Sequence, residues 1–198
     1  MCIRDRDSGI EVIPVWNKSN REHAIIGSEP ATTRAAADAA VKALDWKFPY
    51  FCDADHINLQ TVGRFLDACD FYTIDVAGFI GQAAPDLAID SFVERYSELL
   101  GSIQLEGTKA SFEITPEIFR QTARKYLTAV INAGKVYRTI AAAKGEGNFI
   151  SEVSMDETDT QQTPVELLVI LAAIADEKMC IRDRRPCFSA PASLFPCL

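Results

Sequence analysis

Long apolar runs are missing from this sequence of 198 residues, and none approaches the ~20 residues that a transmembrane helix requires. Basic residues are also scarce, because 20 lysines and arginines stand against 28 aspartates and glutamates, for a formal net charge of -8. Proteins that bind nucleic acid or anionic membranes need a basic surface, so we expect no nucleic acid and no membrane as partner. Small molecules remain as the ligands that this composition favours.

Cysteine is concentrated near the two ends of the chain, in and after a hexapeptide that occurs twice. The sequence MCIRDR fills residues 1–6 and recurs unchanged at 179–184. A perfect short repeat is similar to the translation of a transposase-end adapter from sequencing-library preparation, whereas repeats that build a fold are longer and diverged. Residues 1–6 are therefore interpreted as an adapter artefact, and 179–198 as the same artefact with a disordered tail. The alternative is a genuine tail that happens to repeat.

Without those ends, the remaining residues 7–178 are more acidic and contain few cysteines. Taking away five arginines and two aspartates moves the formal net charge from -8 to -11. The two cysteines that remain, Cys52 and Cys69, lie in apolar surroundings and offer no disulfide framework. Because no signal peptide is recognisable either, the expected compartment is the reducing cytoplasm.

Short apolar runs alternate with helical patterns along residues 7–178, which is typical of α/β proteins. Strands are predicted at residues 10–16, directly after Pro49, at 71–77 and at 148–155. Helices are predicted at residues 30–44, 59–69, 86–100, 116–144 and 164–175. A polar, β-like stretch at 103–114 predicts a small hairpin inserted between these units.

Local signals refine some of these boundaries. Ser28 is predicted to cap the helix at 30–44, and the spacing of Thr163 and Glu166 predicts a capping box for the last helix. Glu166 is therefore interpreted as a structural residue. His23 falls in a predicted polar loop and is interpreted as a solvated histidine, with a ligand or substrate contact as the alternative.

Carboxylates and one imidazole gather where three of the predicted strands end. They are Asp53, Asp55 and His56 after the second strand, Asp75 in the third, and Glu152 and Asp156 in and after the fourth. The carboxyl ends of parallel strands meet at one edge of a sheet, which is where α/β enzymes build their sites. Imidazole and carboxylates together suit a divalent cation such as zinc, manganese or nickel. The alternative is a set of acids that only make hydrogen bonds in loops.

Four stretches of the sequence resemble the tagaturonate epimerase family. They are YFCDADHINL at 50–59, DFYTIDVA at 70–77, GNFISEVSMDET at 147–158 and QTPVELL at 162–168. The resemblance covers residues 10–177 and implies a TIM-barrel-like, metal-dependent enzyme of hexuronate catabolism. Its small-molecule substrate would be a ketohexuronate, because the family interconverts D-tagaturonate and D-fructuronate.

The implied reaction inverts the hydroxyl-bearing carbon β to the ketone, whose proton is not acidic, so enolisation alone cannot achieve it. We favour retro-aldol cleavage and re-addition over a transient oxidation, with a metal stabilising the enediolate and a carboxylate moving the hydroxyl proton. On this resemblance, and by position, we assign His56 and Glu152 as metal ligands, Asp55 and Asp75 as catalytic groups that transfer a proton or orient His56, and Asp53 and Asp156 as substrate-binding residues.

A complete eight-stranded barrel takes about 250 residues. Residues 7–178 are fewer, so the sequence predicts a truncated, partial TIM-barrel-like (β/α) catalytic domain with a small β insertion. Because an open barrel exposes unpaired strand edges, we expect this chain alone to be inactive and prone to aggregate. Two other functions stay open: another metal-dependent sugar isomerase or aldolase, and a non-catalytic sugar-binding α/β protein.

Overall fold

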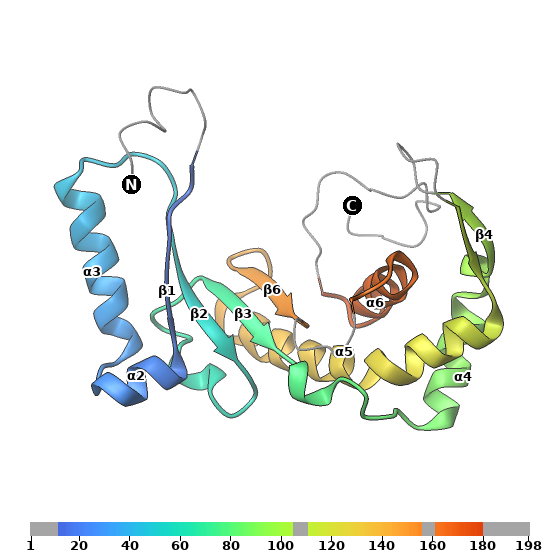
Figure 1. The fold of residues 1–198 in the computed structure, drawn as a ribbon. Helices are drawn as coiled ribbons and strands as arrows, with labels where there is room; N and C mark the ends of the chain where they lie inside the picture. The colour runs from blue at the N-terminus through green and yellow to red at the C-terminus, as the bar shows by residue number, and fades with distance from the viewer. Residues whose placement is uncertain (1–11, 105–110, 156–160, 180–198) are drawn as a thin grey trace. The chain divides into compact units, whose positions relative to one another are not determined.

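The computed structural model describes residues 12–104, 111–155 and 161–179 of the chain (Figure 1). The chain divides into two compact units. Unit 1 comprises Met1–Asp75 and Arg138–Ser154, and unit 2 comprises Val76–Tyr137 and Met155–Leu198. None of the helices in the described ranges combines the length and apolarity that crossing a bilayer needs.

Unit 1 is built on a parallel sheet. Within the described residues its strands are β1 (Val15–Ser19), β2 (Phe51–Ile57), β3 (Phe71–Asp75) and β6 (Ile150–Ser154), in the spatial order β1-β2-β3-β6 (Figure 1). Helices α2 (Asn20–Ile26) and α3 (Pro30–Ala43) connect β1 to β2. The predicted α/β class is confirmed. The described strands form an open sheet, as expected of a partial barrel-like fold.

The two faces of this sheet differ in polarity. Side chains alternate along each strand, and on one face Cys52, Ala54, Tyr72 and Ile74 are all fully buried. By the same alternation and the strand register, the opposite face starts with apolar residues, Val15, Phe51, Phe71 and Ile150, and then carries polar ones: Asn17, Ser19, Asp53, Asp55, Thr73, Asp75, Glu152 and Ser154. We call this second surface the polar face. Parallel strands usually bury apolar side chains on both faces, so a polar face indicates function more than packing.

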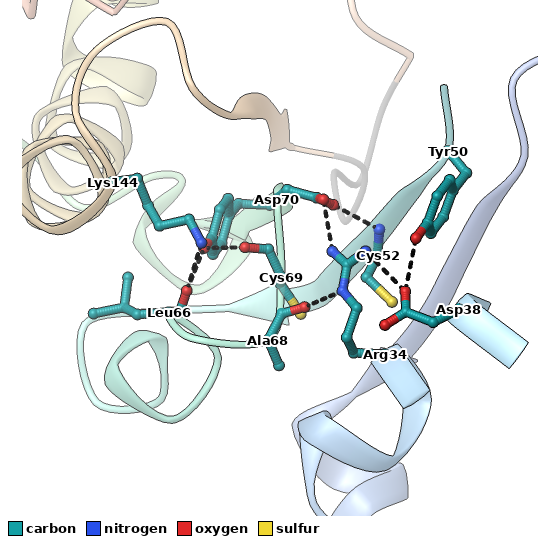
Figure 2. A network of polar contacts seen from close by, with 10 residues as sticks. Arg34, Asp38, Tyr50, Cys52, Leu66, Ala68, Cys69, Asp70 and Lys144 are labelled. Atoms are coloured by element: carbon teal, nitrogen blue, oxygen red, sulfur yellow. Dashed lines mark hydrogen bonds and ion pairs between the residues drawn. The ribbon is translucent and has the colours of Figure 1, made fainter. Parts of the chain in front are cut away.

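On the apolar side of the sheet, Arg34 of α3 joins the helix to β2 and to the start of β3 (Figure 2). Its Nη2 lies 2.6 Å from Asp70 Oδ2, and its Nε donates to the carbonyl oxygen of Ala68 at 2.8 Å. Asp70 Oδ1 in turn accepts a hydrogen bond of 2.7 Å from the backbone amide of Cys52. The carboxylate of Asp70, directly before β3, therefore links α3 to β2.

We expect Asp70→Ala to lower the free energy of unfolding of unit 1 by about 2 kcal/mol, because it leaves a half-buried guanidinium and a backbone amide without their acceptor. Asp38→Ala is the matched control, since Asp38 also contacts Arg34 but is half exposed and should cost less than about 0.5 kcal/mol. Both tryptophans, Trp16 and Trp46, lie in unit 1, so urea titrations followed by tryptophan fluorescence report on this unit. Equal losses for the two variants would contradict the role given to Asp70.

Unit 2 combines helices with an antiparallel hairpin. Its elements are α4 (Asp86–Arg95), β4 (Gly101–Gln104), β5 (Ser111–Ile114), α5 (Pro116–Lys144) as far as Tyr137, and α6 (Pro164–Asp176). The hairpin confirms the predicted β insertion, and a short 3-10 turn takes up the last part of the helix predicted at 86–100. In the core, the rings of Phe92 and Phe119 stack with their centroids 5.6 Å apart.

Helix α6 begins with the predicted capping box. The Thr163 hydroxyl accepts from the amide of Glu166, and the Glu166 carboxylate accepts from the amide of Thr163 at 2.8 Å. Glu166 Oε1 also accepts from Lys125 Nζ at 2.8 Å and from the Tyr126 hydroxyl at 3.2 Å, both on α5. These contacts lower the pKa of Glu166 against the effect of its burial. Glu166 thus joins α6 to α5.

We expect Thr163→Ala to destabilise unit 2 by about 1 kcal/mol, because the first turn of α6 loses a side-chain acceptor for a backbone amide. Thr163→Ser keeps the hydroxyl and should stay close to the wild type. Urea unfolding followed by circular dichroism measures both variants. A serine variant as unstable as the alanine variant would show that the hydroxyl is not what matters.

The helix predicted at 59–69 is wrong. Residues 58–69 instead form turns around a single 3-10 turn, Val62–Arg64. The side chain of Asn58 accepts from the amides of Gln60 and Thr61, and this local turn competes with helix formation. Val62, Phe65 and Cys69 of the apolar pattern are nevertheless buried, whereas Leu59 is exposed, so the spacing identified most of the buried side chains but not the backbone.

The first strand lies later in the chain than predicted. Residues 12–14 are not in a strand, and β1 starts at Val15 and continues through the polar residues of the expected loop. Its position follows from pairing with β2, in which Asn17 is opposite Asp53 and Ser19 is opposite Asp55. Polar residues are accepted in β1 because they lie on the polar face or at the edge of the described sheet.

The interpretation of His23 as a solvated loop histidine is also wrong. His23 lies in α2, is 1% exposed, and contacts the ring of Phe65 with centroids 5.8 Å apart. Its Nδ1 is 2.8 Å from the Ser28 hydroxyl, and burial lowers the pKa of the imidazole.

The predicted cap of α3 by Ser28 is not formed, because the Ser28 hydroxyl bonds to His23. The N-cap of α3 is Glu29, which makes no side-chain capping bond. A Ser19 and Glu22 capping box starts α2, a signal that was present in the sequence.

Candidate active site

The candidate site lies on the polar face of unit 1, towards the carboxyl ends of its strands. Asp55 and His56 lie near the end of β2, as predicted, whereas Asp53 lies in the middle of the strand. His56 Nδ1 donates to Asp55 Oδ1 at 2.7 Å. Because a carboxylate can only accept, this bond favours the tautomer that carries its lone pair on Nε2. The arrangement is the one in which a carboxylate orients a metal-binding histidine.

A bulge in β2 explains how two consecutive side chains come together. The pairing with β3 runs from Ala54 with Tyr72 to Ile57 with Ile74, so Asp55 and His56 both lie opposite Thr73. His56 has a φ of 51°, in the left-handed region that non-glycine residues rarely adopt. In a regular strand Asp55 and His56 would point to opposite faces, and the bulge removes that separation.

Asp53 is the most deeply buried acid of the polar face, at 7% exposure. The amide of Thr73 donates to its Oδ1 at 3.1 Å, and the Thr73 hydroxyl donates to its Oδ2 at 3.0 Å. The pKa of Asp53 is raised to about 6, mainly by burial and also by the charges of Asp55 and Glu152, while the two hydrogen bonds from Thr73 act in the opposite direction. The predicted contact of Asp53 with substrate stays a prediction.

The other acids of the predicted site are distributed over two strands. Glu152 lies in the middle of β6, is exposed, and pairs in register with Thr73. Asp75 is the last residue of β3 and pairs in register with Ser154. Asp156, predicted to bind substrate, lies outside the described residues. The sheet therefore places Asp53, Asp55, Asp75 and Glu152 on one face. The catalytic, substrate-binding and metal-binding roles assigned to these residues stay predictions.

The donor types on this face suit a divalent cation, but a complete ligand set is not formed by the described ranges alone. There, no three histidine, cysteine, aspartate or glutamate side chains lie close enough together to hold a metal ion. A metal held by His56 and Glu152 would need further ligands. Thr73 was missed by the sequence analysis, although a polar residue inside the apolar run FYTID gave a signal for it.

The fold and the site together define the class: this is an α/β protein with an open parallel sheet, one face of which carries acidic side chains and an imidazole. Crystal structures of fructuronate-tagaturonate epimerase UxaE from Cohnella laeviribosi have a similar fold. The form with one glycerol has a TM-score of 0.66 at 19% identity, and the native form 0.62 at 19%. Each match covers 82% of this chain, which spans 36% of the length of the matched structures.

The family itself is identified from the sequence. A sequence profile of the tagaturonate epimerases matches residues 5–189, and the chain belongs to this family. No curated protein matches the chain. The matched range includes the last two residues of the first hexapeptide copy and all of the second. The domain boundaries at 7 and 178 stay predictions.

Proposed function

We propose that this chain forms part of the active site of an enzyme that interconverts D-tagaturonate and D-fructuronate. Family membership supports the substrate class. The observation that carries the proposal is the Asp55–His56 pair, which a bulge places on a polar sheet face beside buried and exposed acids. The compartment we propose is the cytoplasm, in keeping with the two buried, unpaired cysteines Cys52 and Cys69.

The residues of the polar face suit retro-aldol chemistry. A carboxylate, for which we propose Asp55 or Asp75, would take the proton of the β-hydroxyl while the bond between the α and β carbons breaks. The bonding electrons move to the ketone side as an enediolate, and the β carbon becomes an aldehyde. When the aldehyde rotates so that its other face meets the enediolate, the bond between the α and β carbons re-forms on that face. The carboxylate then returns the proton to the new hydroxyl.

His56 and Glu152 are the residues that we propose as ligands of a divalent metal. Such an ion would stabilise the negative charge that develops on the ketone side. Asp55 would hold the imidazole of His56 in the orientation and tautomer that a ligand needs, through the bond of 2.7 Å. Asp53 and Asp156 are proposed to contact the substrate hydroxyl groups.

An isotope experiment tests this function and its mechanism together. A full-length member of the family is given D-tagaturonate with deuterium on the β carbon. Retro-aldol chemistry predicts D-fructuronate that keeps the deuterium without a primary isotope effect, because the bond from this carbon to hydrogen never breaks. A primary isotope effect would indicate transient oxidation instead. Turnover of neutral ketohexoses in preference to ketohexuronates would favour another sugar isomerase or aldolase.

A further inference from the structure

The bulge in β2 is a strained feature that must be held in place. It contains the two residues proposed to act together, and one of them, His56, has a left-handed backbone. Such a conformation is disfavoured for non-glycine residues and persists only where the surrounding contacts determine it.

The residue opposite the bulge makes a two-point contact across it. Thr73 uses both its amide and its hydroxyl to bind the two oxygens of Asp53, at 3.1 and 3.0 Å. Asp53 stands two residues before Asp55, so this contact crosses between the strands where their register shifts. Asp53 and Thr73 are 7% and 6% exposed, and at such burial the hydrogen bonds exclude water and resist rearrangement.

We propose that Asp53 and Thr73 are positioning residues: their contact holds the β2 bulge and thereby keeps His56 Nδ1 directed at Asp55. Both act through the backbone of β2 and through Asp55, and for Asp53 this positioning role is separate from the substrate contact proposed above. The importance of this geometry for catalysis rests on the proposed function. The geometry itself can be measured without any activity.

The test uses the tautomer of His56 in the 198-residue chain at about pH 8, where an unperturbed imidazole is neutral. With ¹⁵N-labelled histidine, long-range ¹H–¹⁵N spectra show which ring nitrogen carries the proton. The chain has two histidines, and His56→Ala assigns the signals. We expect the wild type to show a proton on Nδ1 of His56. In Thr73→Val the difference between the two ¹⁵N shifts should fall by at least half, as it should in Asp55→Asn.

Two further variants make the result decisive. Thr73→Ser keeps the hydroxyl and should retain the wild-type signals, so loss of the tautomer in this variant would overturn the proposal even if Thr73→Val fails to fold. Thr122→Val removes another buried threonine hydroxyl, on α5, and should leave His56 unchanged. A folded Thr73→Val chain with wild-type His56 signals would likewise overturn the proposal. The experiment measures the tautomer of His56 and no turnover. Its result therefore stands even if the proposed epimerase activity is not found.

Discussion

Asp53→Asn is expected to make unit 1 more stable at pH 8 by roughly 2 kcal/mol, and to change its stability little at about pH 3. Burial raises the pKa of Asp53 from its ordinary 3.8 to about 6. Between these values the folded chain binds a proton that the unfolded chain has lost. The stability contributed by this group is therefore fully present below the lower value and is lost as pH rises to 6. Asparagine removes the buried charge and can still accept from Thr73.

Urea titrations at the two pH values, followed by the fluorescence of Trp16 and Trp46, measure this effect in unit 1. Asp67→Asn serves as the control, because Asp67 is exposed and its replacement should have little effect at either pH. The expected result is a stabilisation confined to neutral and alkaline pH. A loss of stability at pH 8 in Asp53→Asn would mean that the charge of Asp53 strengthens its bonds to Thr73 by more than burial costs.

Asp55→Asn is expected to reduce epimerase activity by about 10- to 100-fold, the usual cost of removing the carboxylate that orients a metal-binding histidine. The amide keeps the size of the side chain but loses the negative charge that favours the Nδ1 proton of His56. If Asp55 also transfers the proton of the β-hydroxyl, the loss should exceed this range.

This comparison belongs in a full-length member of the family, at the position that aligns with Asp55. The matched control is the position that aligns with Asn17, because Asn17 lies on the same face and has no proposed role. Alanine there should leave the turnover number within about twofold, well below the loss expected for Asp55→Asn. Equal losses at both positions would indicate general damage to the face, and full activity of the Asp55 variant would remove Asp55 from the mechanism.

Elements with strong local signals were predictable from the sequence. The aromatic and β-branched run 71–77 became β3, and the spacing of Thr163 and Glu166 became the capping box of α6. The hairpin at 103–114 was also predicted. In each case the residue types within one short window of the sequence contain the information that the prediction needs.

Features that depend on contacts between distant residues were not predictable in the same way. The position of β1 follows from its pairing with β2, more than thirty residues later. His23 is buried and contacts the ring of Phe65, and no local sequence pattern predicts that contact. The bulge that joins Asp55 to His56 exists only in the register between β2 and β3. The sequence thus named the acids and the imidazole, while their geometry required the sheet.

His56 is proposed here as a metal ligand in an epimerase site on the polar face. The most direct measurement is the metal content and epimerase activity of a full-length family member, with and without alanine at the position aligned with His56. We predict a stoichiometric divalent metal in the wild type, and loss of both metal and epimerase activity in the variant. An alanine variant that keeps its metal and interconverts D-tagaturonate and D-fructuronate at the wild-type rate would show that His56 is not a required metal ligand.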